Sequence, residues 1–364
     1  MRMGGIFDIP NLRPLGRFCA GRAEKAGLLP LFWAGSGLEL CFTGEELHVL
    51  LEADFAGAEP WIAVEVDGAA LIRMPLNRGT NEVCVLRGVS DGRARRVRLI
   101  KECQPMAGDP RHGLWARGLR WEGGRFLPLP EAAHRLEFVG DSLTSGEGVV
   151  GAVKEDAWIP AVFSAGGTWA MRTAAALDAE VRLISQSGWG VRSGWDNDPR
   201  HALPDWYERA CGPALGAADR ELGAQEAYDF ASWRPGAVIV NLGTNDANAM
   251  NNAVWEDPGG PFRQERGPEG LSAFEEAAAA FLRKLRRCNP KAKLVWAYGM
   301  AEDSLRPPLE RAVLRYREET GDEEAYFLSL PMARPETMGS RQHPGPLCHE
   351  EAAQATAAFL KSIL

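Results

Sequence analysis

Apolar and polar residues alternate with a period near two through the first third of the chain. The clearest runs are LELCFTG, ELHVLLEADF, NEVCVLRGV and RRVRLIKEC. This alternation is typical of antiparallel strands that bury one face. In the run WIAVEVDGAALIRMPL, Asp67 and Gly68 separate two apolar segments in the way that hairpin turns do. We therefore predict an all-β sandwich domain over residues 1–125, without a helix.

The pattern changes after residue 125. The run EGGRFLPLPEAAH contains glycine and proline and has neither period, so residues 126–134 are assigned to a linker. Five apolar runs then alternate with helical segments, as in βαβ units, and predict an α/β domain over residues 135–364 with a five-stranded parallel sheet flanked by helices. The apolar runs are RLEFVG, EVRLISQ, AVIVNLG, KLVWAYG and AYFLSLP; the helical segments are 167–178, 272–287, 305–320 and 349–363. Ser272 and Glu275 have capping-box spacing and predict the start of the second helix.

Charge and composition narrow the classes of partner. The net charge is -8, with lysine and arginine spread along the chain, so neither nucleic acid nor an anionic membrane is an expected partner. The amino-terminal run MRMGGIFDIPNLRPLGRF is unlike a signal peptide, and no segment reaches transmembrane length. The seven cysteines are scattered without a C-x-x-C pair. We expect a cytoplasmic protein with reduced thiols, no metal and no other cofactor.

Polar residues follow three of the predicted strands. They form the blocks GDSLTSG at 140–146, QSGWG at 186–190 and GTND at 243–246, and a fourth block, QHPG at 342–345, lies just before the last helix. Open parallel sheets bind their ligands at the carboxyl ends of the strands. The chemistry of the protein is therefore expected where these blocks meet.

The blocks contain the groups that acyl transfer requires. Ser142 is a candidate nucleophile and His343 a candidate general base. An oxyanion needs preorganised donors, and the backbone N–H of Ser142, the backbone N–H of Gly188 and the side-chain amide of Asn245 supply them. Gly190 is an alternative to Gly188, because the run S-G-W-G contains both. The alternative for Ser142 is a turn serine that caps the next helix.

As a set, the four blocks resemble those of the SGNH/GDSL hydrolases and cover residues 135–364. The resemblance implies a flavodoxin-like sheet, with Ser142 as nucleophile, His343 as base, and Gly188 and Asn245 as oxyanion donors. A β-sandwich directly before HRLEFVGDSLTSGEG, with FWAGSGLELCFTG and VEVDG inside it, is similar to the family-2 carbohydrate esterases. This narrower resemblance implies a jelly-roll first domain and removal of acetyl groups from sugar hydroxyls.

One position departs from the family pattern. SGNH enzymes commonly carry an aspartate three residues before the histidine, and Ser340 stands there in this chain. Loss of the orienting acid costs on the order of 10⁴-fold in the subtilisin example. We hypothesise a Ser–His dyad in which a main-chain carbonyl near residues 338–340 accepts the His343 Nδ1–H bond. Glu336 is the nearest acidic alternative in sequence.

Aromatic residues near the blocks are candidates for sugar binding. Trp189 lies inside the glycine block and Trp255 follows the GTND block, and tryptophan rings are natural platforms for the apolar face of a sugar. Plain core packing is the alternative for each ring.

The sequence and the resemblance together therefore predict a serine esterase that removes acetyl groups from acetylated sugars or oligosaccharides through an acyl-enzyme intermediate. Two alternatives stay open. One is a general GDSL lipase, thioesterase or aryl esterase, which would need an extended apolar groove for a longer acyl chain. The other is a catalytically impaired carbohydrate-binding protein, which Ser340 keeps under consideration.

Overall fold

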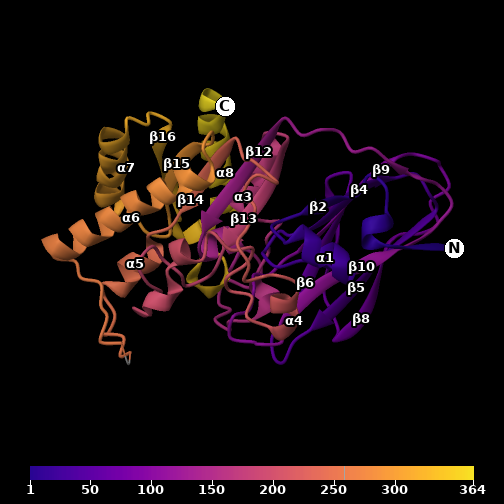
Figure 1. Cartoon of the computed structure of the whole chain (residues 1–364), viewed down its shortest axis with the longest axis horizontal. Coiled ribbons are helices and arrows are strands. Elements are labelled where there is room, and N and C mark those ends of the chain that lie inside the picture. The colour runs from indigo at the N-terminus through magenta and orange to yellow at the C-terminus, as the bar shows by residue number, and fades with distance from the viewer. Residues whose placement is uncertain (258) are drawn as a thin grey trace. The chain divides into compact units, whose positions relative to one another are not determined.

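The computed structural model describes residues 1–257 and 259–364, whose contacts divide the chain into two compact units (Figure 1). The first unit consists of Met1–Glu131, Ile159–Gly166 and Arg209–Tyr228. The second consists of Ala132–Trp158, Gly167–Glu208 and Asp229–Leu364. The predicted domain limits at residues 125 and 135 stay predictions, and the first unit also includes two short segments from the later part of the chain.

The first unit contains two antiparallel sheets. The strands are β1 (Arg2–Gly5), β2 (Arg13–Leu15), β3 (Leu29–Pro30), β4 (Gly37–Phe42), β5 (Glu46–Asp54), β6 (Trp61–Val66), β7 (Ala69–Pro75), β8 (Gly79–Leu86), β9 (Arg95–Lys101), β10 (Gly113–Glu122) and β11 (Phe126–Leu127). One sheet has the order β1-β10-β5-β8, with β3 paired to β10, and the other has the order β11-β4-β9-β6-β7, with β2 paired to β4. Inward-facing residues such as Leu51, Val64 and Leu99 are fully buried in one core. The predicted antiparallel sandwich is confirmed.

The hairpin between β6 and β7 forms where the sequence predicts it. Asp67 and Gly68 have φ angles of 52° and 82°, as a two-residue hairpin turn requires. The prediction of no helix in this region is wrong, because α1 covers Ala20–Ala26. Only Ala23 of this short helix is buried, so it leaves no apolar period in the sequence. A second short helix of the first unit is α4 (Ala217–Glu221).

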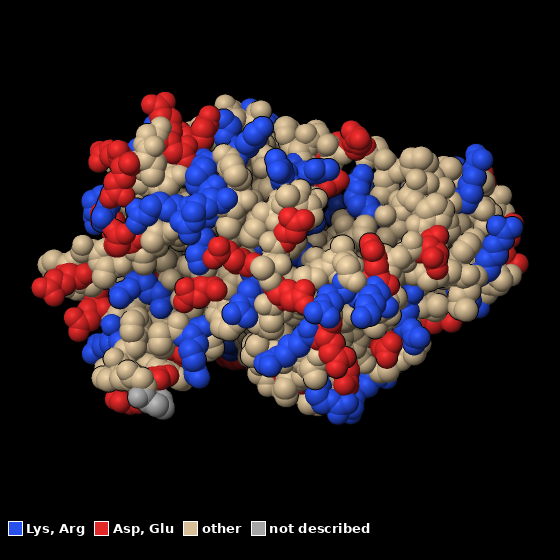
Figure 2. Space-filling model, in the orientation of Figure 1, with Lys and Arg blue, Asp and Glu red and all other residues tan. Residues whose placement is uncertain are grey.

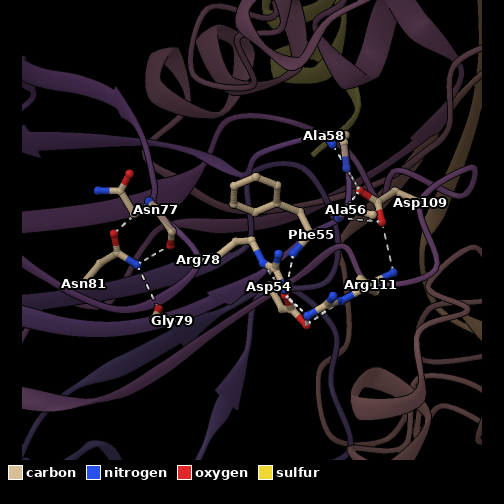
Figure 3. Close-up of polar contacts among 11 residues, drawn as sticks. Asp54, Phe55, Ala56, Ala58, Asn77, Arg78, Gly79, Asn81, Asp109 and Arg111 are labelled. Carbon is tan, nitrogen blue, oxygen red and sulfur yellow. Dashed lines mark hydrogen bonds and ion pairs between the residues drawn. The ribbon is translucent and has the colours of Figure 1, made fainter.

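Asp109 joins two loops of the first unit (Figure 3). Its carboxylate accepts backbone N–H bonds from each residue of the segment 56–58 at 2.8–3.0 Å, and from Arg111 at 3.0 Å. Partial burial raises the pKa of Asp109, but these N–H donors outweigh it and lower the pKa to about 2. The guanidinium of the same Arg111 donates to both carboxylate oxygens of Asp54 at 2.9 Å.

The second unit is built on a parallel sheet. Its strands are β12 (His134–Gly140), β13 (Ala179–Ser185), β14 (Ala237–Asn241), β15 (Lys293–Met300) and β16 (Ala325–Met332), in the order β13-β12-β14-β15-β16. All five residues of β14 are buried, which explains its unbroken apolar run. The chain passes from β12 to β13 on one side and then returns to β14 on the other. This is the flavodoxin-like order, whose switch point opens a crevice at the carboxyl ends of the strands, and it confirms the predicted fold class.

Helices cover this sheet in two packed pairs, α3 with α8 and α6 with α7. The helices of the unit are α2 (Ser142–Ser145), α3 (Trp169–Ala176), α5 (Thr244–Ala249), α6 (Pro268–Cys288), α7 (Arg306–Thr320) and α8 (Pro346–Ile363). Short 3₁₀ turns of the whole chain span Ile6–Asp8, Pro160–Val162, Pro199–His201, Leu203–Asp205, Pro335–Thr337 and Ser340–Gln342. The predicted start of α6 at Ser272 is wrong, because Pro268 occupies the first helical turn after Gly267, a position that suits proline.

Candidate active site

Ser142 stands at the first position of α2, directly after β12. The Asp141 side chain caps this helix by accepting a 3.1 Å hydrogen bond from the Leu143 N–H. A Cβ at Gly140 would lie 2.2 Å from the Thr144 side chain, so the sharp turn from strand to helix requires glycine there. The turn places the Ser142 side chain at the carboxyl end of the parallel sheet.

His343 meets Ser142 at that end of the sheet. Its Nε2 lies 2.9 Å from the Ser142 Oγ, and its Nδ1 lies 2.7 Å from the Arg341 carbonyl oxygen. A carbonyl can only accept a hydrogen bond, so Nδ1 carries the proton in the neutral imidazole and Nε2 is free to accept the serine proton. The two side chains therefore have the geometry of a nucleophile and its base.

The orienting acceptor is a main-chain carbonyl, supplied by Arg341 and thus one residue beyond the predicted range 338–340. The Ser340 hydroxyl donates instead to the Val150 carbonyl at 2.7 Å. Glu336 is paired with Arg334 at 2.8 Å. Neither Ser340 nor Glu336 is thus the partner of the imidazole.

Two backbone donors are available for an oxyanion near Ser142. Within residues 1–257 and 259–364, the N–H groups of Ser142 and Gly188 have no acceptor in the chain, and Gly188 lines the same cavity as Ser142. The N–H of Gly190 donates to the His201 carbonyl at 3.2 Å, so Gly188 is better placed than its alternative. The Asn245 side chain lines the same cavity, but its two N–H groups donate to the Trp189 carbonyl at 2.9 Å and to Asp141 Oδ2 at 3.2 Å, so it serves an oxyanion only when it gives up one of these bonds.

Buried carboxylates fix the loops around these donors. Asp141 Oδ2 accepts a 3.2 Å hydrogen bond from the Asn245 amide. Full burial is the main cause that raises the pKa of Asp141 to about 7. Asp246 accepts the N–H bonds of Val191 and Arg192 at 2.8 and 2.9 Å, and burial raises its pKa as well. These bonds hold the glycine block against the GTND block.

A cavity of about 810 Å³ opens over Ser142 and His343. It is lined by Ser142, Leu143, Glu147, Trp158, Ser187, Gly188, Trp195, Thr244, Asn245, Asn248, Ala301, Glu302, Arg341, Gln342 and His343. The lining combines aromatic rings with hydroxyl, amide and charged groups, which suits a ligand that has both apolar faces and hydroxyl groups.

A family comparison agrees with this geometry. Residues 138–324 match the model of the GDSL-like lipase/acylhydrolase family. The chain belongs to this family. Among solved structures, the GDSL chain is similar to the acetyl xylan esterase Est2A from the rumen bacterium Butyrivibrio proteoclasticus, with 40% identity, a TM-score of 0.95, and coverage of 99% of this chain and 98% of that one.

Other relatives include a family-2 carbohydrate esterase and two further esterases. One is the enzyme from Clostridium thermocellum in complex with cellohexaose, with 25% identity, a TM-score of 0.79, and coverage of 96% of this chain and 98% of that one. The cellulase/esterase CelE of Acetivibrio thermocellus is 27% identical over 341 residues, which are 91% of this GDSL chain but only 37% of CelE. An acetylxylan esterase/glucomannan deacetylase of Cellvibrio japonicus is 26% identical over 295 residues, covering 80% of this chain and 72% of that protein.

The tryptophans that line the cavity over Ser142 and His343 differ from those predicted to bind sugar. The ring of Trp189 is only 6% exposed and stacks on His201, with ring centroids 5.1 Å apart. Trp255 lies beneath the Arg200 guanidinium at 5.3 Å. Neither lines the cavity, so the prediction of Trp189 and Trp255 as sugar platforms needs correction.

Trp158 and Trp195 are the tryptophans that line the cavity, and they are 45% and 53% exposed. Trp195 follows the glycine block closely in sequence, which is the only signal that could have identified it. Trp158 has no such signal. Sequence reasoning also missed Arg341 and Glu147, because a main-chain carbonyl and a distant carboxylate belong to no motif.

The second histidine near the site has a structural environment. His349 is fully buried, and its Nδ1 accepts the Trp169 N–H at 3.0 Å. Burial is the main cause that lowers its pKa to about 3, so it is unsuited to be a base.

Across residues 1–257 and 259–364, no three His, Cys, Asp or Glu side chains are grouped so that they could hold a metal ion. No helix in the described part of the chain is long and apolar enough to cross a membrane.

Proposed function

We propose that this chain is a serine esterase that removes acetyl groups from acetylated sugars or oligosaccharides. The observation that carries the proposal is the 2.9 Å contact between the Ser142 Oγ and the His343 Nε2 at the floor of an open cavity. The similarity to Est2A, described as an acetyl xylan esterase, supports the acyl group and the substrate class.

The geometry supports a two-step reaction. In the first step, the Ser142 Oγ attacks the acetyl carbonyl while His343 Nε2 takes the serine proton. The negative charge then develops on the carbonyl oxygen, where the N–H groups of Ser142 and Gly188 stabilise it. The Asn245 amide joins them by turning one N–H from the Asp141 carboxylate, its longer bond at 3.2 Å, to the oxyanion. His343 returns its proton to the leaving sugar oxygen, which releases the alcohol and leaves an acetyl-serine. In the second step, His343 takes a proton from the water that attacks this ester and returns it to the Ser142 Oγ as the acetyl–serine bond breaks, which releases acetate and restores the free serine.

We further propose that Trp158 and Trp195 bind the sugar. Their rings line the cavity and are about half exposed, so a sugar can cover them at little cost in conformational entropy. A related enzyme is described as a complex with cellohexaose, which is consistent with an oligosaccharide along such a surface. Acidic and basic side chains are interspersed over the face of the molecule in Figure 2.

The substrate class is tested by acetate release. The panel contains acetylated monosaccharides and oligosaccharides, with acetyl and octanoyl esters of one chromophore added. We expect acetyl esters to react faster, and faster cleavage of the octanoyl ester would favour a general lipase or thioesterase instead. Trp195→Phe should keep most of the affinity for sugars, whereas Trp195→Ala should raise KM for sugar esters more than for the chromophore ester.

We also propose a cytoplasmic location, on the basis of the cysteines. None of the seven cysteines is paired in a disulfide in the described part of the chain, which suits the reducing cytoplasm.

A further inference from the structure

The buried carboxylate of Glu147 lies beside the His343 imidazole. It is near Nε2, whereas the aspartate of a catalytic triad lies near Nδ1. Glu147 is 3% exposed, and its Oε2 lies 4.0 Å from the His343 Nε2. The aspartate of a triad would contact Nδ1, but that nitrogen is bonded to the Arg341 carbonyl. The second oxygen of Glu147 lies 3.3 Å from the Arg341 Nε. One carboxylate therefore faces both the base and the residue that orients the base.

Arg341 has a backbone conformation that must be held in place. Its φ angle is 58°, and Gln342 follows with a φ angle of 55°, both in the left-handed region that side chains other than glycine seldom adopt. The Arg341 N–H donates to the Glu155 carbonyl at 2.7 Å, and its guanidinium donates to the Asp156 carbonyl. With Glu147, these contacts hold the arginine at both ends, so that its carbonyl points at the imidazole.

We propose that Glu147 is a positioning residue with the two functions that the aspartate has in a catalytic triad, namely orienting the histidine and stabilising its charged form. It anchors Arg341, whose carbonyl orients His343, and its charge stabilises the imidazolium that forms when Ser142 loses its proton. This inference rests on the proposed esterase mechanism. It explains how Ser340 can stand at the usual position of the acid without loss of the base.

Other ionisable groups near the imidazole act differently. His349 on α8 is neutral at working pH, because burial lowers its pKa to about 3. Asp141 precedes the nucleophile, and its pKa is about 7. Glu302 also lines the cavity, but its carboxylate accepts the N–H bonds of Asp303 and Ser304. Asp141 titrates in the same range as an imidazole, so the test compares variants in which Asp141 is unchanged.

Titration of His343 by NMR tests the charge directly and needs no turnover. Its Cε1–H signal is assigned by its absence in His343→Gln. Glu147→Gln should lower the midpoint of this titration by about half a pH unit or more, because the carboxylate is lost while the nearby guanidinium stays. Arg341→Gln should raise the midpoint, because Glu147 then faces the imidazole alone. Gln342 already adopts a similar φ angle, so glutamine suits this backbone.

Opposite shifts support the proposal, and unchanged midpoints or shifts in the same direction overturn it. Glu147→Asp retains the charge and should lie between the wild type and Glu147→Gln. Glu351→Gln is the matched control, since it breaks an exposed glutamate–arginine pair with Arg334 and should leave the midpoint unchanged. Circular dichroism and thermal unfolding establish that each variant is folded. If Glu147→Gln does not fold, the titration of Glu147→Asp is compared with that of the wild type instead.

Kinetics separates this inference from the proposed function. Glu147→Gln should reduce kcat on p-nitrophenyl acetate by about 10- to 100-fold with little change in KM, and its acid limb should move to lower pH. A lack of hydrolysis by the wild type, or hydrolysis that survives Ser142→Ala, would contradict the esterase itself. Hydrolysis that depends on Ser142 but is unaffected by Glu147→Gln would contradict only the role of Glu147.

Discussion

Asp109 in the first unit and Asp141 in the second both accept backbone N–H bonds, yet their pKa values move in opposite directions. Asp109 is partly exposed and accepts four neighbouring N–H groups, and its pKa is lowered to about 2. Asp141 is fully buried, accepts the N–H of Leu143 and the Asn245 amide, and has a pKa raised to about 7. The balance between donors and burial therefore decides the sign.

The difference separates a carboxylate that stabilises loops from one that serves a reactive site. The charge on Asp109 is well solvated by N–H groups, so it stabilises the folded chain. The charge on Asp141 is costly, and the fold retains the residue where it caps the nucleophile helix and orients Asn245. We expect changes in the first environment to affect stability, and changes in the second to affect catalysis.

The largest expected effect is that of Ser142→Ala. Loss of the nucleophile should reduce kcat/KM on acetyl esters by about 10⁴-fold or more, with little change in the free energy of unfolding. Ser145→Ala is a useful contrast, because the Ser145 hydroxyl donates to the Ser185 hydroxyl at 3.0 Å and should affect stability more than rate. Steady-state kinetics and urea unfolding measure both quantities. Activity of Ser142→Ala close to that of the wild type would contradict the role of Ser142 as nucleophile.

Asn245→Ala should have the next largest effect. Loss of one oxyanion donor reduces kcat by about 10²- to 10³-fold in known cases, and here KM should change less than kcat. The control is Asn251→Ala, which removes an amide bonded at 3.3 Å to the Ala247 carbonyl. If both variants lose activity equally, the Asn245 amide does not serve the oxyanion.

Asp141 predicts an unusual dependence of stability on pH. Its pKa of about 7 in the folded chain lies above its ordinary value of 3.8, so the folded state binds this proton more tightly than the unfolded state does. Its contribution is therefore present at low pH and is lost as the pH rises from about 4 to about 7. Urea unfolding at a series of pH values should show this loss in the wild type but not in Asp141→Asn. Identical dependence of stability on pH in the wild type and in Asp141→Asn would contradict the raised pKa of Asp141.

Asp109 predicts the opposite sign and a smaller effect. Its folded pKa of about 2 lies below the ordinary value of 3.8, so its contribution is present above pH 4 or so and is lost as the pH falls through about 2. Asp109→Asn should reduce the free energy of unfolding at pH 7 by about 1–2 kcal/mol, once solvent screening is allowed for. Esterase activity should not change. Reduced activity without reduced stability would contradict the separation.

The sequence predicts the elements of this fold better than their details. Strand periods, the Asp67–Gly68 turn and the four blocks depend on local patterns, and the structure has each of them where the pattern predicts. The predicted start of α6 at Ser272 is too late in the chain, because Ser272 and Glu275 have capping-box spacing within a helix that already begins at Pro268.

Other features depend on tertiary structure and have no local pattern. Trp189 and Trp195 are six residues apart, and only the fold determines that the first is buried and the second is 53% exposed. The acceptor of the His343 Nδ1–H bond is a backbone carbonyl, which every residue has. Only the left-handed conformation of Arg341 directs that carbonyl to the imidazole.

Active-site labelling tests the central claim most directly. The intact mass of the protein is measured after treatment with a fluorophosphonate, and the adduct is located by peptide mapping. We predict one adduct, on Ser142 in the wild type, which is absent in Ser142→Ala and forms far more slowly in His343→Ala. Labelling of Ser142→Ala at the wild-type rate, or an adduct on another residue, would contradict the assignment of the nucleophile and its base.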